Sequence, residues 1–335
     1  MKRERKKVLV IATGGTIASK KTKDGLSPQI KPEIILNYVP DIKEICNVDI
    51  IQLFNIDSTN MTPKHWLKVA QTIEKNYEKY DGFVILHGTD TMAYTAAALS
   101  YLIQNVEKPI VLTGAQQPID RDITDAKANL LNSFLYAAGE NNGGVVVLFD
   151  NSVISGTRAR KTRTKSFHAF SSIDFPELAI MRDGKTIPYI KKEKSLRKPT
   201  FYHSLNTNIF VLKLIPGVDA TIFPYLKEHY DAIIIESFGV GGVPFSENNS
   251  FIDAIEDWIK SGKTIVMTTQ VPHEGSDMAV YKVGYKIKEK YELIEAYDMT
   301  LEAVVTKLMW ILGKTKESEE IKKMFYTPVN YDILI

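Results

Sequence analysis

Two stretches of this sequence end an apolar run at glycine and then present a threonine. Residues 8–12 lead through Thr-Gly-Gly into Thr16, and residues 83–86 lead through His-Gly into Thr89 and Asp90. Apolar runs that stop at a glycine turn are typical of buried parallel strands, and open α/β sheets bind ligands just beyond the carboxyl ends of their strands. Two threonine hydroxyls beside a carboxylate therefore indicate one site.

These residue types suit nucleophilic attack on a carbonyl group. A threonine hydroxyl is a weak nucleophile and needs a base or a strongly polarised neighbourhood. A buried lysine can serve, because burial lowers its pKa and lets it take up a proton. Backbone N–H groups beside Gly15, Gly88 or Gly114 are candidate donors to an oxyanion. Asp90 is placed to pair with a lysine or with a substrate ammonium group.

A basic run at residues 158–165 is the candidate source of that lysine. Its cations are Arg158, Arg160, Lys161, Arg163 and Lys165. We expect one of them to enter a buried site near Thr89. Aromatic residues follow at Phe167 and Phe170, so single-stranded nucleic acid is the alternative ligand of this run. The net charge of the chain is only +2, which disfavours a nucleic-acid partner.

The elements that must position these residues repeat about every 30 residues as a strand, a glycine or polar turn, and a helix. This pattern is typical of βαβ units with a parallel sheet. Thr62 and Pro63 begin one helix, as N-cap and first helical residue. We expect N-terminal strands at 8–12, 48–54, 83–87, 109–113 and 144–149, with helices at 32–38, 63–77, 91–104 and around 129–134.

A polar and basic stretch at residues 187–207 lacks apolar periodicity and indicates a domain boundary. The predicted fold is α/β, with a larger N-terminal parallel-sheet domain (1–190), a linker (191–207) and a smaller C-terminal α/β domain (208–335). We expect C-terminal strands at 209–214, 232–236 and 264–269, and helices at 220–230, 251–260 and 300–312.

The bulk composition indicates a soluble cytoplasmic protein with no membrane partner. The single cysteine, Cys46, cannot form an internal disulfide. The apolar run after the basic N-terminus has five residues, fewer than a signal peptide needs, and no run reaches the length of a membrane span.

Other chemistries lack their motifs. None of the six histidines has a metal-ligand spacing, and His87 is expected to be a structural histidine. Neither a serine-hydrolase elbow nor a Walker A motif is present, and the glycine-rich run 238–243 lacks a full dinucleotide fingerprint. The loop at 19–31 is expected to be mobile, either as a lid over the site or as an ordinary surface loop.

Together the motifs resemble those of the bacterial-type L-asparaginase family, and the resemblance covers nearly the whole chain. Residues 12–18 and 87–92 are similar to the two family signatures. Residues 55–61 resemble the segment that binds the substrate α-carboxylate, residues 113–115 a third strand end, and residues 156–162 the segment with the active-site lysine. The similarity is greatest to the cytoplasmic type I members. It implies hydrolysis of L-asparagine to L-aspartate and ammonia, without metal or other cofactor.

The resemblance also implies residue roles. Thr16 would be the primary nucleophile, and Thr89, Asp90 and Lys161 would form a second catalytic cluster. Ser58 would bind the α-carboxylate, and Asp90 the α-ammonium group. The implied substrate-binding set is Gly15, Asp57, Ser58, Thr59, Gly88, Asp90 and Ala115. The partners would be a small amino-acid substrate and further copies of the chain, in a homodimer or homotetramer with sites at the intersubunit face.

The chain departs from the family pattern at two places. Many members have a tyrosine in the loop after the first strand, whereas Gly25 is followed here by Leu26. Some members supply a polar residue from the neighbouring subunit, for which Asp277 and Tyr281 are the candidates. The alternatives to an asparaginase are the related subunit of a tRNA-dependent glutamine amidotransferase, which normally carries an extra N-terminal domain, and a non-enzymatic amino-acid-binding protein.

Overall fold

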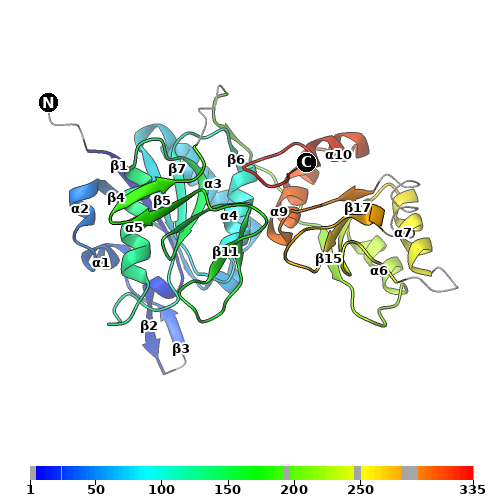
Figure 1. The fold of residues 1–335 in the computed structure, drawn as a ribbon, viewed down its shortest axis with the longest axis horizontal. Helices are drawn as coiled ribbons and strands as arrows, with labels where there is room; N and C mark the ends of the chain where they lie inside the picture. The colour runs from blue at the N-terminus through cyan, green and yellow to red at the C-terminus, as the bar shows by residue number, and fades with distance from the viewer. Residues whose placement is uncertain (1–4, 24, 192–196, 245–249, 281–292, 335) are drawn as a thin grey trace. The chain divides into compact units, whose positions relative to one another are not determined.

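The structure is a computed structural model that describes residues 5–23, 25–191, 197–244, 250–280 and 293–334 (Figure 1). The chain divides into two compact units between His203 and Ser204. The predicted linker, 191–207, spans this division, and residues 192–196 of it lie outside the described residues. In the described part of the chain, no helix has the length and apolarity that a membrane crossing requires.

The N-terminal unit is built on a mainly parallel sheet, which is the predicted fold class. Its central strands are buried on both faces, and every residue of β5 is buried. Neighbouring strands from β4 to β8 run parallel, whereas β9, β12 and β13 continue the sheet antiparallel. Within the described residues the order is β13 (Lys185–Pro188), β12 (Ala179–Arg182), β9 (Ser152–Ser155), β8 (Gly144–Phe149), β7 (Pro109–Thr113), β5 (Gly82–Leu86), β1 (Lys7–Gly14) and β4 (Asn47–Ile56).

Helices of this unit pack on the sheet through apolar faces. The face predicted for the helix after Thr62 is confirmed, because Trp66, Val69 and Ile73 are all buried. Helix α4 contacts β7 and β8, while α5 contacts β1, β5 and β7. The helices are α1 (Pro32–Asn37), α2 (Ile42–Ile45), α3 (Pro63–Asn76), α4 (Met92–Leu102) and α5 (Ala126–Ala138), with 3-10 turns η1 (Thr16–Ala18), η2 (Ser58–Asn60) and η3 (Tyr77–Lys79).

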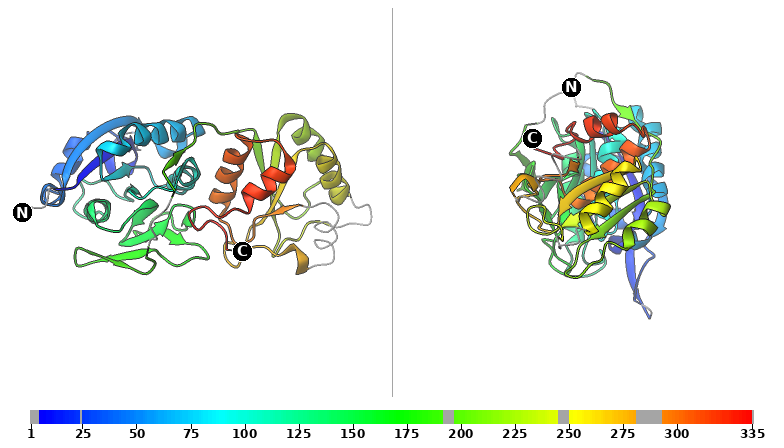
Figure 2. Two further views of the ribbon diagram at one scale, coloured as in Figure 1. Left: turned by 90° about the horizontal axis from the view of Figure 1, so that it is seen from above. Right: turned by 90° about the vertical axis from the view of Figure 1, so that its right-hand side faces the viewer.

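The segment after the first strand differs from the expected irregular loop. It forms an antiparallel hairpin of β2 (Ser19–Thr22) and β3 (Gly25–Pro28), in which Lys20 pairs with Ser27. Figures 1 and 2 show this hairpin projecting from the N-terminal unit. Its strands are short and rich in polar residues, and therefore lack the apolar alternation by which strands are identified in a sequence.

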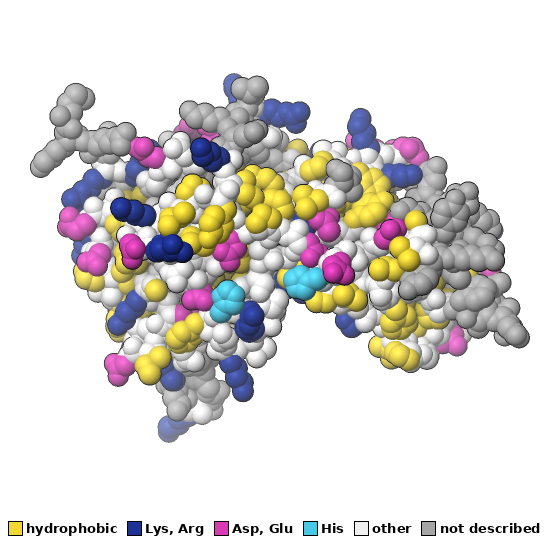
Figure 3. All heavy atoms as spheres, viewed as in Figure 1, with side chains coloured by type: hydrophobic (Ala, Val, Ile, Leu, Met, Phe, Trp, Pro, Cys, Tyr) yellow, Lys and Arg dark blue, Asp and Glu magenta, His cyan; other side chains and the backbone are white. Residues whose placement is uncertain are grey.

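The basic run also adopts a strand that the sequence did not predict. Strand β10 (Ala159–Lys161) pairs antiparallel with β11 (Phe170–Ser172), so that Lys161 lies opposite Phe170. Elsewhere in the unit β6 (Ile103–Gln104) pairs with β14 (Thr200–Phe201). Figure 3 shows acidic and basic side chains interspersed on the face that it draws, which agrees with the nearly neutral charge of the chain.

The C-terminal unit contains a second parallel sheet. Three of its described strands lie where the sequence predicted them, and the short fourth strand was not predicted. The core of the unit includes the fully buried Trp258, with Phe223 and Ile235 in the same cluster. The sheet order is β15 (Ile209–Lys213), β16 (Ala232–Ser237), β17 (Thr264–Thr269) and β18 (Ile294–Glu295). The longer helices are α6 (Ile222–His229), α7 (Ser250–Lys260), α9 (Leu301–Leu312) and α10 (Ser318–Phe325), and η4 (Met278–Val280) is a 3-10 turn.

Candidate active site

The candidate site lies where β1, β5 and β7 end. These strands are neighbours in the sheet and run parallel, so their carboxyl ends share one edge. Thr16 follows β1, Thr89 follows β5 and Ala115 follows β7. Thr16 begins the 3-10 turn η1 and is half-buried, whereas Thr89 is only 5% exposed. The parallel register therefore brings the two predicted threonines to the same edge.

Two glycines allow the first two strand ends to approach each other at backbone distance. Gly15 has a φ of +85°, and a Cβ added to it would lie 2.4 Å from the backbone nitrogen of Gly88. A Cβ added to Gly88 would lie 2.6 Å from the Ser58 hydroxyl oxygen. Both distances are shorter than any real Cβ contact, so a side chain at either position would separate the three segments. The two glycines, both predicted to bind substrate, thus allow the segments after β1, β4 and β5 to pack in direct contact.

Lys161 is the cation that joins the second threonine. Its ammonium nitrogen lies 2.7 Å from the hydroxyl oxygen of Thr89 and 2.6 Å from Oδ1 of Asp90. The Lys161 side chain is 15% exposed and that of Asp90 is 58% exposed. Strand β10 carries the lysine across to the sheet edge. The structure therefore brings Thr89, Asp90 and Lys161 together, the cluster that the family resemblance implied.

The Ser58 hydroxyl group lies beside Gly88, shortly beyond the end of β4. Ser58 is 3% exposed, and within the described residues its side chain makes no hydrogen bond. Its backbone is fixed, because the Thr91 hydroxyl donates to the Ser58 carbonyl oxygen over 2.8 Å. Asp57 Oδ1 accepts from the backbone and the hydroxyl of Thr59, both at 2.9 Å, and thereby caps the turn η2. Asp57 and Thr59 thus shape the turn that presents Ser58.

His87 is a structural residue, as the sequence predicted. It is fully buried, and burial lowers the pKa of its imidazole to about 4. The Gly88 carbonyl oxygen lies 2.7 Å from Nδ1 and can only accept, so Nδ1 carries the proton of the neutral ring. Nε2 therefore accepts from the Thr95 hydroxyl group at 2.8 Å, and the Trp66 indole donates to the Thr95 oxygen. A neutral His87 therefore fixes the Gly88–Thr89 peptide.

Gln116 belongs to the site, although the sequence did not single it out. The Thr89 hydroxyl donates to Oε1 of Gln116 over 3.1 Å. Its predicted neighbour Ala115 is fully buried, so only its backbone is available to a ligand. A polar residue shortly beyond the end of β7 was the available signal, but many such residues are solvated.

The nucleophile candidate lacks an activating partner in the described part of the chain, where the Thr16 side chain makes no hydrogen bond. The candidates for a contribution from a neighbouring subunit lie in the C-terminal unit. Oδ1 of Asp277 accepts from the backbone of Ala279, and Tyr281 lies outside the described residues. No described contact joins Thr16 to a base.

Comparison with known proteins identifies the family. The model "Asparaginase, N-terminal" matches residues 7–194, and "Glutaminase/Asparaginase C-terminal domain" matches residues 208–325. The L-asparaginase of Thermococcus kodakarensis is 35% identical over 95% of this chain and 96% of its own. The solved structure of the thermostable L-asparaginase from that organism covers 98% of this chain and 99% of its own, with a TM-score of 0.92 and 34% identity.

Two further relatives represent the type I enzymes and the amidotransferases. L-asparaginase I from Vibrio cholerae has a TM-score of 0.87 at 30% identity, over 99% of this chain and 100% of that one. A glutamyl-tRNA(Gln) amidotransferase subunit from Pyrococcus abyssi is 36% identical over 96% of this chain and 75% of its own. The matches confirm the predicted enzyme class, an amidohydrolase. This chain belongs to the asparaginase family.

Proposed function

We propose that this protein hydrolyses L-asparagine to L-aspartate and ammonia. The observation that carries the proposal is the Lys161 ammonium nitrogen, held between the Thr89 hydroxyl and Oδ1 of Asp90 at the strand end that contacts Gly15. This arrangement places Lys161, which can carry a proton, beside the hydroxyl group of Thr89. A hydroxyl group and a proton carrier in contact are the groups that amide hydrolysis requires.

Two polar groups of the site can still form hydrogen bonds and are available to the α-ammonium and α-carboxylate groups of a substrate. In the described residues, Oδ1 of Asp90 pairs with Lys161, while Oδ2 accepts no hydrogen bond and is available to a substrate ammonium group. The buried Ser58 hydroxyl is available to a carboxylate. These two groups suit an α-amino acid, and the similarity to L-asparaginases supports one whose side chain carries an amide.

The reaction has two steps in this proposal. The Thr16 hydroxyl oxygen attacks the amide carbon, and the C–N bond breaks to leave an aspartyl ester on Thr16 and ammonia, which takes the hydroxyl proton. Water then attacks the ester, the C–O bond to Thr16 breaks, and the proton returns to the Thr16 oxygen. The cluster of Thr89, Lys161 and Asp90 moves protons to and from the reacting groups. Backbone N–H groups near Gly88 are the candidate donors to the oxyanion.

We also propose that the protein acts as a homodimer or homotetramer. Family resemblance supports this proposal, and so does the Thr16 hydroxyl, which lacks a hydrogen-bonding partner in the described part of its own chain. A neighbouring copy would then supply a group to the site.

Ammonia release by the purified protein, from asparagine and from glutamine, tests the proposed function. We expect release from asparagine that persists in EDTA and without any nucleotide. Release from glutamine only when further subunits and tRNA are present would instead identify an amidotransferase subunit. Binding of asparagine, measured by calorimetry, without any release would identify a binding protein. Complete loss of activity in EDTA would contradict the metal-free reaction.

A further inference from the structure

Gln116 contacts the proposed catalytic cluster without being one of its members. The Thr89 oxygen accepts from the Lys161 ammonium group at 2.7 Å and donates its own proton to Oε1 of Gln116 at 3.1 Å. An ammonium group has donors only, and a hydroxyl group has a single proton. The direction of both hydrogen bonds is therefore fixed, and Gln116 holds the Thr89 proton away from Lys161.

The orientation of the Gln116 amide is fixed from its other end. Its Nε2 donates to the backbone carbonyl oxygen of Ser166 over 3.2 Å. If the amide were rotated by half a turn, Oε1 would face that carbonyl oxygen and Nε2 would face Thr89. Two acceptors would then oppose each other, which costs a hydrogen bond. The Ser166 carbonyl thus selects the rotamer that turns an acceptor toward Thr89.

The backbone of Gln116 is held by a buried carboxylate. Asp125 is 7% exposed and accepts from the backbone nitrogen of Gln116 at 2.8 Å and from that of Gln117 at 3.0 Å. Asn129 donates to the same carboxylate over 3.2 Å. Burial raises the pKa of Asp125, and these hydrogen bonds act in the opposite direction. Gln116 is thus held through its backbone as well as its side chain.

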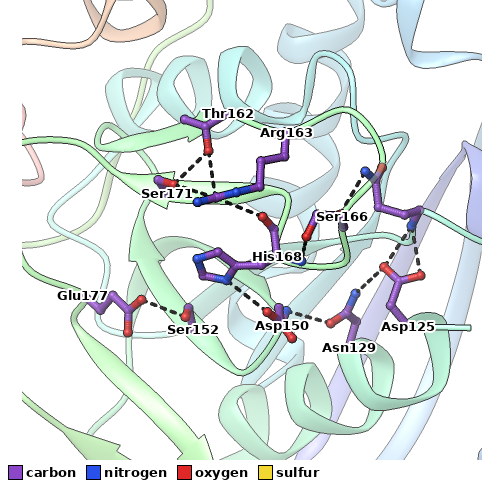
Figure 4. A network of polar contacts seen from close by, with 11 residues as sticks. Asp125, Asn129, Asp150, Ser152, Thr162, Arg163, Ser166, His168, Ser171 and Glu177 are labelled. Carbon is purple, nitrogen blue, oxygen red and sulfur yellow. Dashed lines mark hydrogen bonds and ion pairs between the residues drawn. The ribbon is translucent and has the colours of Figure 1, made fainter. Parts of the chain in front are cut away.

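The Ser166 side of this arrangement connects back to Asn129, as Figure 4 shows. The Ser166 hydroxyl oxygen accepts from the backbone of His168 at 3.2 Å, and the His168 ring lies 3.0 Å from Asp150. The backbone of Asp150 donates to Oδ1 of Asn129 over 2.9 Å. The polar contacts therefore form a closed ring from Gln116 through Ser166 and Asn129, and the ring resists displacement of the amide.

We propose that Gln116 is a positioning residue for the amide hydrolysis proposed above, on which this inference rests. Its neutral carbonyl oxygen holds the Thr89 proton in a weak hydrogen bond and leaves the Thr89 lone pair facing Lys161. When the leaving nitrogen needs a proton, Thr89 releases its own and receives one from Lys161. The proton that Thr16 gives up on attack then restores the ammonium form of Lys161, so the net transfer is from the Thr16 hydroxyl group to ammonia. A carboxylate at position 116 would hold the Thr89 proton more firmly and slow this transfer.

The test compares Gln116→Met with Gln117→Met as a matched control. Methionine keeps the length of glutamine, but its thioether sulfur is a much weaker acceptor than an amide oxygen. The Gln117 side chain makes no hydrogen bond among the described residues, although its backbone shares the same carboxylate. We expect Q116M to lower kcat by about tenfold, the effect of one hydrogen bond used in the transition state. KM should not change, the unfolding midpoint should fall only slightly because the hydrogen bond to Ser166 is lost, and Q117M should match the wild type.

Gln116→Glu supplies a readout that a purely structural role would not move. The protonated carboxyl group can donate to Ser166 and accept from Thr89, as the amide does. The ionised carboxylate cannot donate to Ser166, and it holds the Thr89 proton more strongly. The ratio of the kcat of Q116E to that of the wild type should therefore fall as pH rises through the pKa of the new carboxyl group, which is ordinarily ~4.3. A ratio that is constant across this range would overturn the proposal.

Two results separate this inference from the proposed function. Unchanged kcat in Q116M, with ammonia release by the wild type, would overturn the positioning role alone. If the wild type releases no ammonia, the proposed function fails. The positioning role of Gln116 is then tested by the Thr89 rotamer. Crystal structures of the wild type and Q116M should then differ in Thr89 χ1. An unchanged Thr89 side chain would overturn the role of Gln116.

Discussion

Replacing Lys161 by arginine separates charge from proton transfer at the site. The Lys161 nitrogen lies 2.6 Å from Asp90 and 2.7 Å from Thr89, and the side chain is only 15% exposed, so water has little access to take over its role. Arginine retains the positive charge that Asp90 requires. Its guanidinium group has a pKa above ~12 and does not give up a proton near neutrality. The substitution therefore removes the proton relay and leaves the ion pair.

The expected loss follows from that difference. General acid–base catalysis by a positioned side chain contributes about 10²–10⁴-fold to the rate, so kcat of Lys161→Arg should fall by at least about 10². Ammonia release gives kcat, and calorimetry with aspartate checks that the product still binds. Lys165→Arg is the matched control, because Lys165 is exposed, belongs to the same basic run and makes no described contact. Near-normal kcat in Lys161→Arg would reduce Lys161 to a structural charge.

Three further predictions concern stability and assembly. Burial lowers the pKa of His87 from 6.5 to about 4, so the contribution of neutral His87 to the free energy of unfolding is complete above pH 6.5. This contribution, about 3 kcal/mol, is lost as pH falls to 4. Urea unfolding of the wild type should show the loss, and an equal pH dependence in His87→Gln would contradict it. Asp332 and Lys307 form an ion pair with both side chains 0% exposed, so Asp332→Asn should lower the free energy of unfolding by about 3–5 kcal/mol. Asp257→Asn breaks an exposed ion pair and should lower it by less than about 1 kcal/mol. Similar losses in the two variants would refute this account. Light scattering should find a dimer or tetramer, and a fully active monomer would disprove the proposed assembly.

The parts of the fold that the sequence predicted are those with a strong local pattern. Residues 83–86 form a continuous apolar run, and β5 is buried at every position. Thr62 and Pro63 marked the start of α3, and its apolar face followed from helical periodicity. The hairpin β2–β3 and strand β10 have no such pattern, because their residues are mostly polar and their pairing depends on contacts that the local sequence does not encode.

The candidate site divides in the same way. Thr16 and Thr89 could be predicted because parallel strands place their ends at one edge. Lys161 is separated from Thr89 by 72 positions, and five cations share its run, so the residues alone did not select it. The resemblance to the asparaginase family did. Gln116 was missed because its contact with Thr89 depends on an amide rotamer that the Ser166 carbonyl fixes.

The most direct test of the central claim, that Thr16 is the nucleophile, is to locate the covalent intermediate. Thr89→Val keeps the shape of residue 89 and removes its hydroxyl group, which slows proton transfer in both steps, so that an ester formed on the nucleophile persists long enough to be trapped. The variant is incubated with asparagine, quenched in acid, digested and mapped by mass spectrometry. We predict an aspartyl adduct on the peptide that contains Thr16, and none in the double variant with Thr16→Ala. An adduct on any other peptide, or an adduct that survives Thr16→Ala, would contradict the assignment.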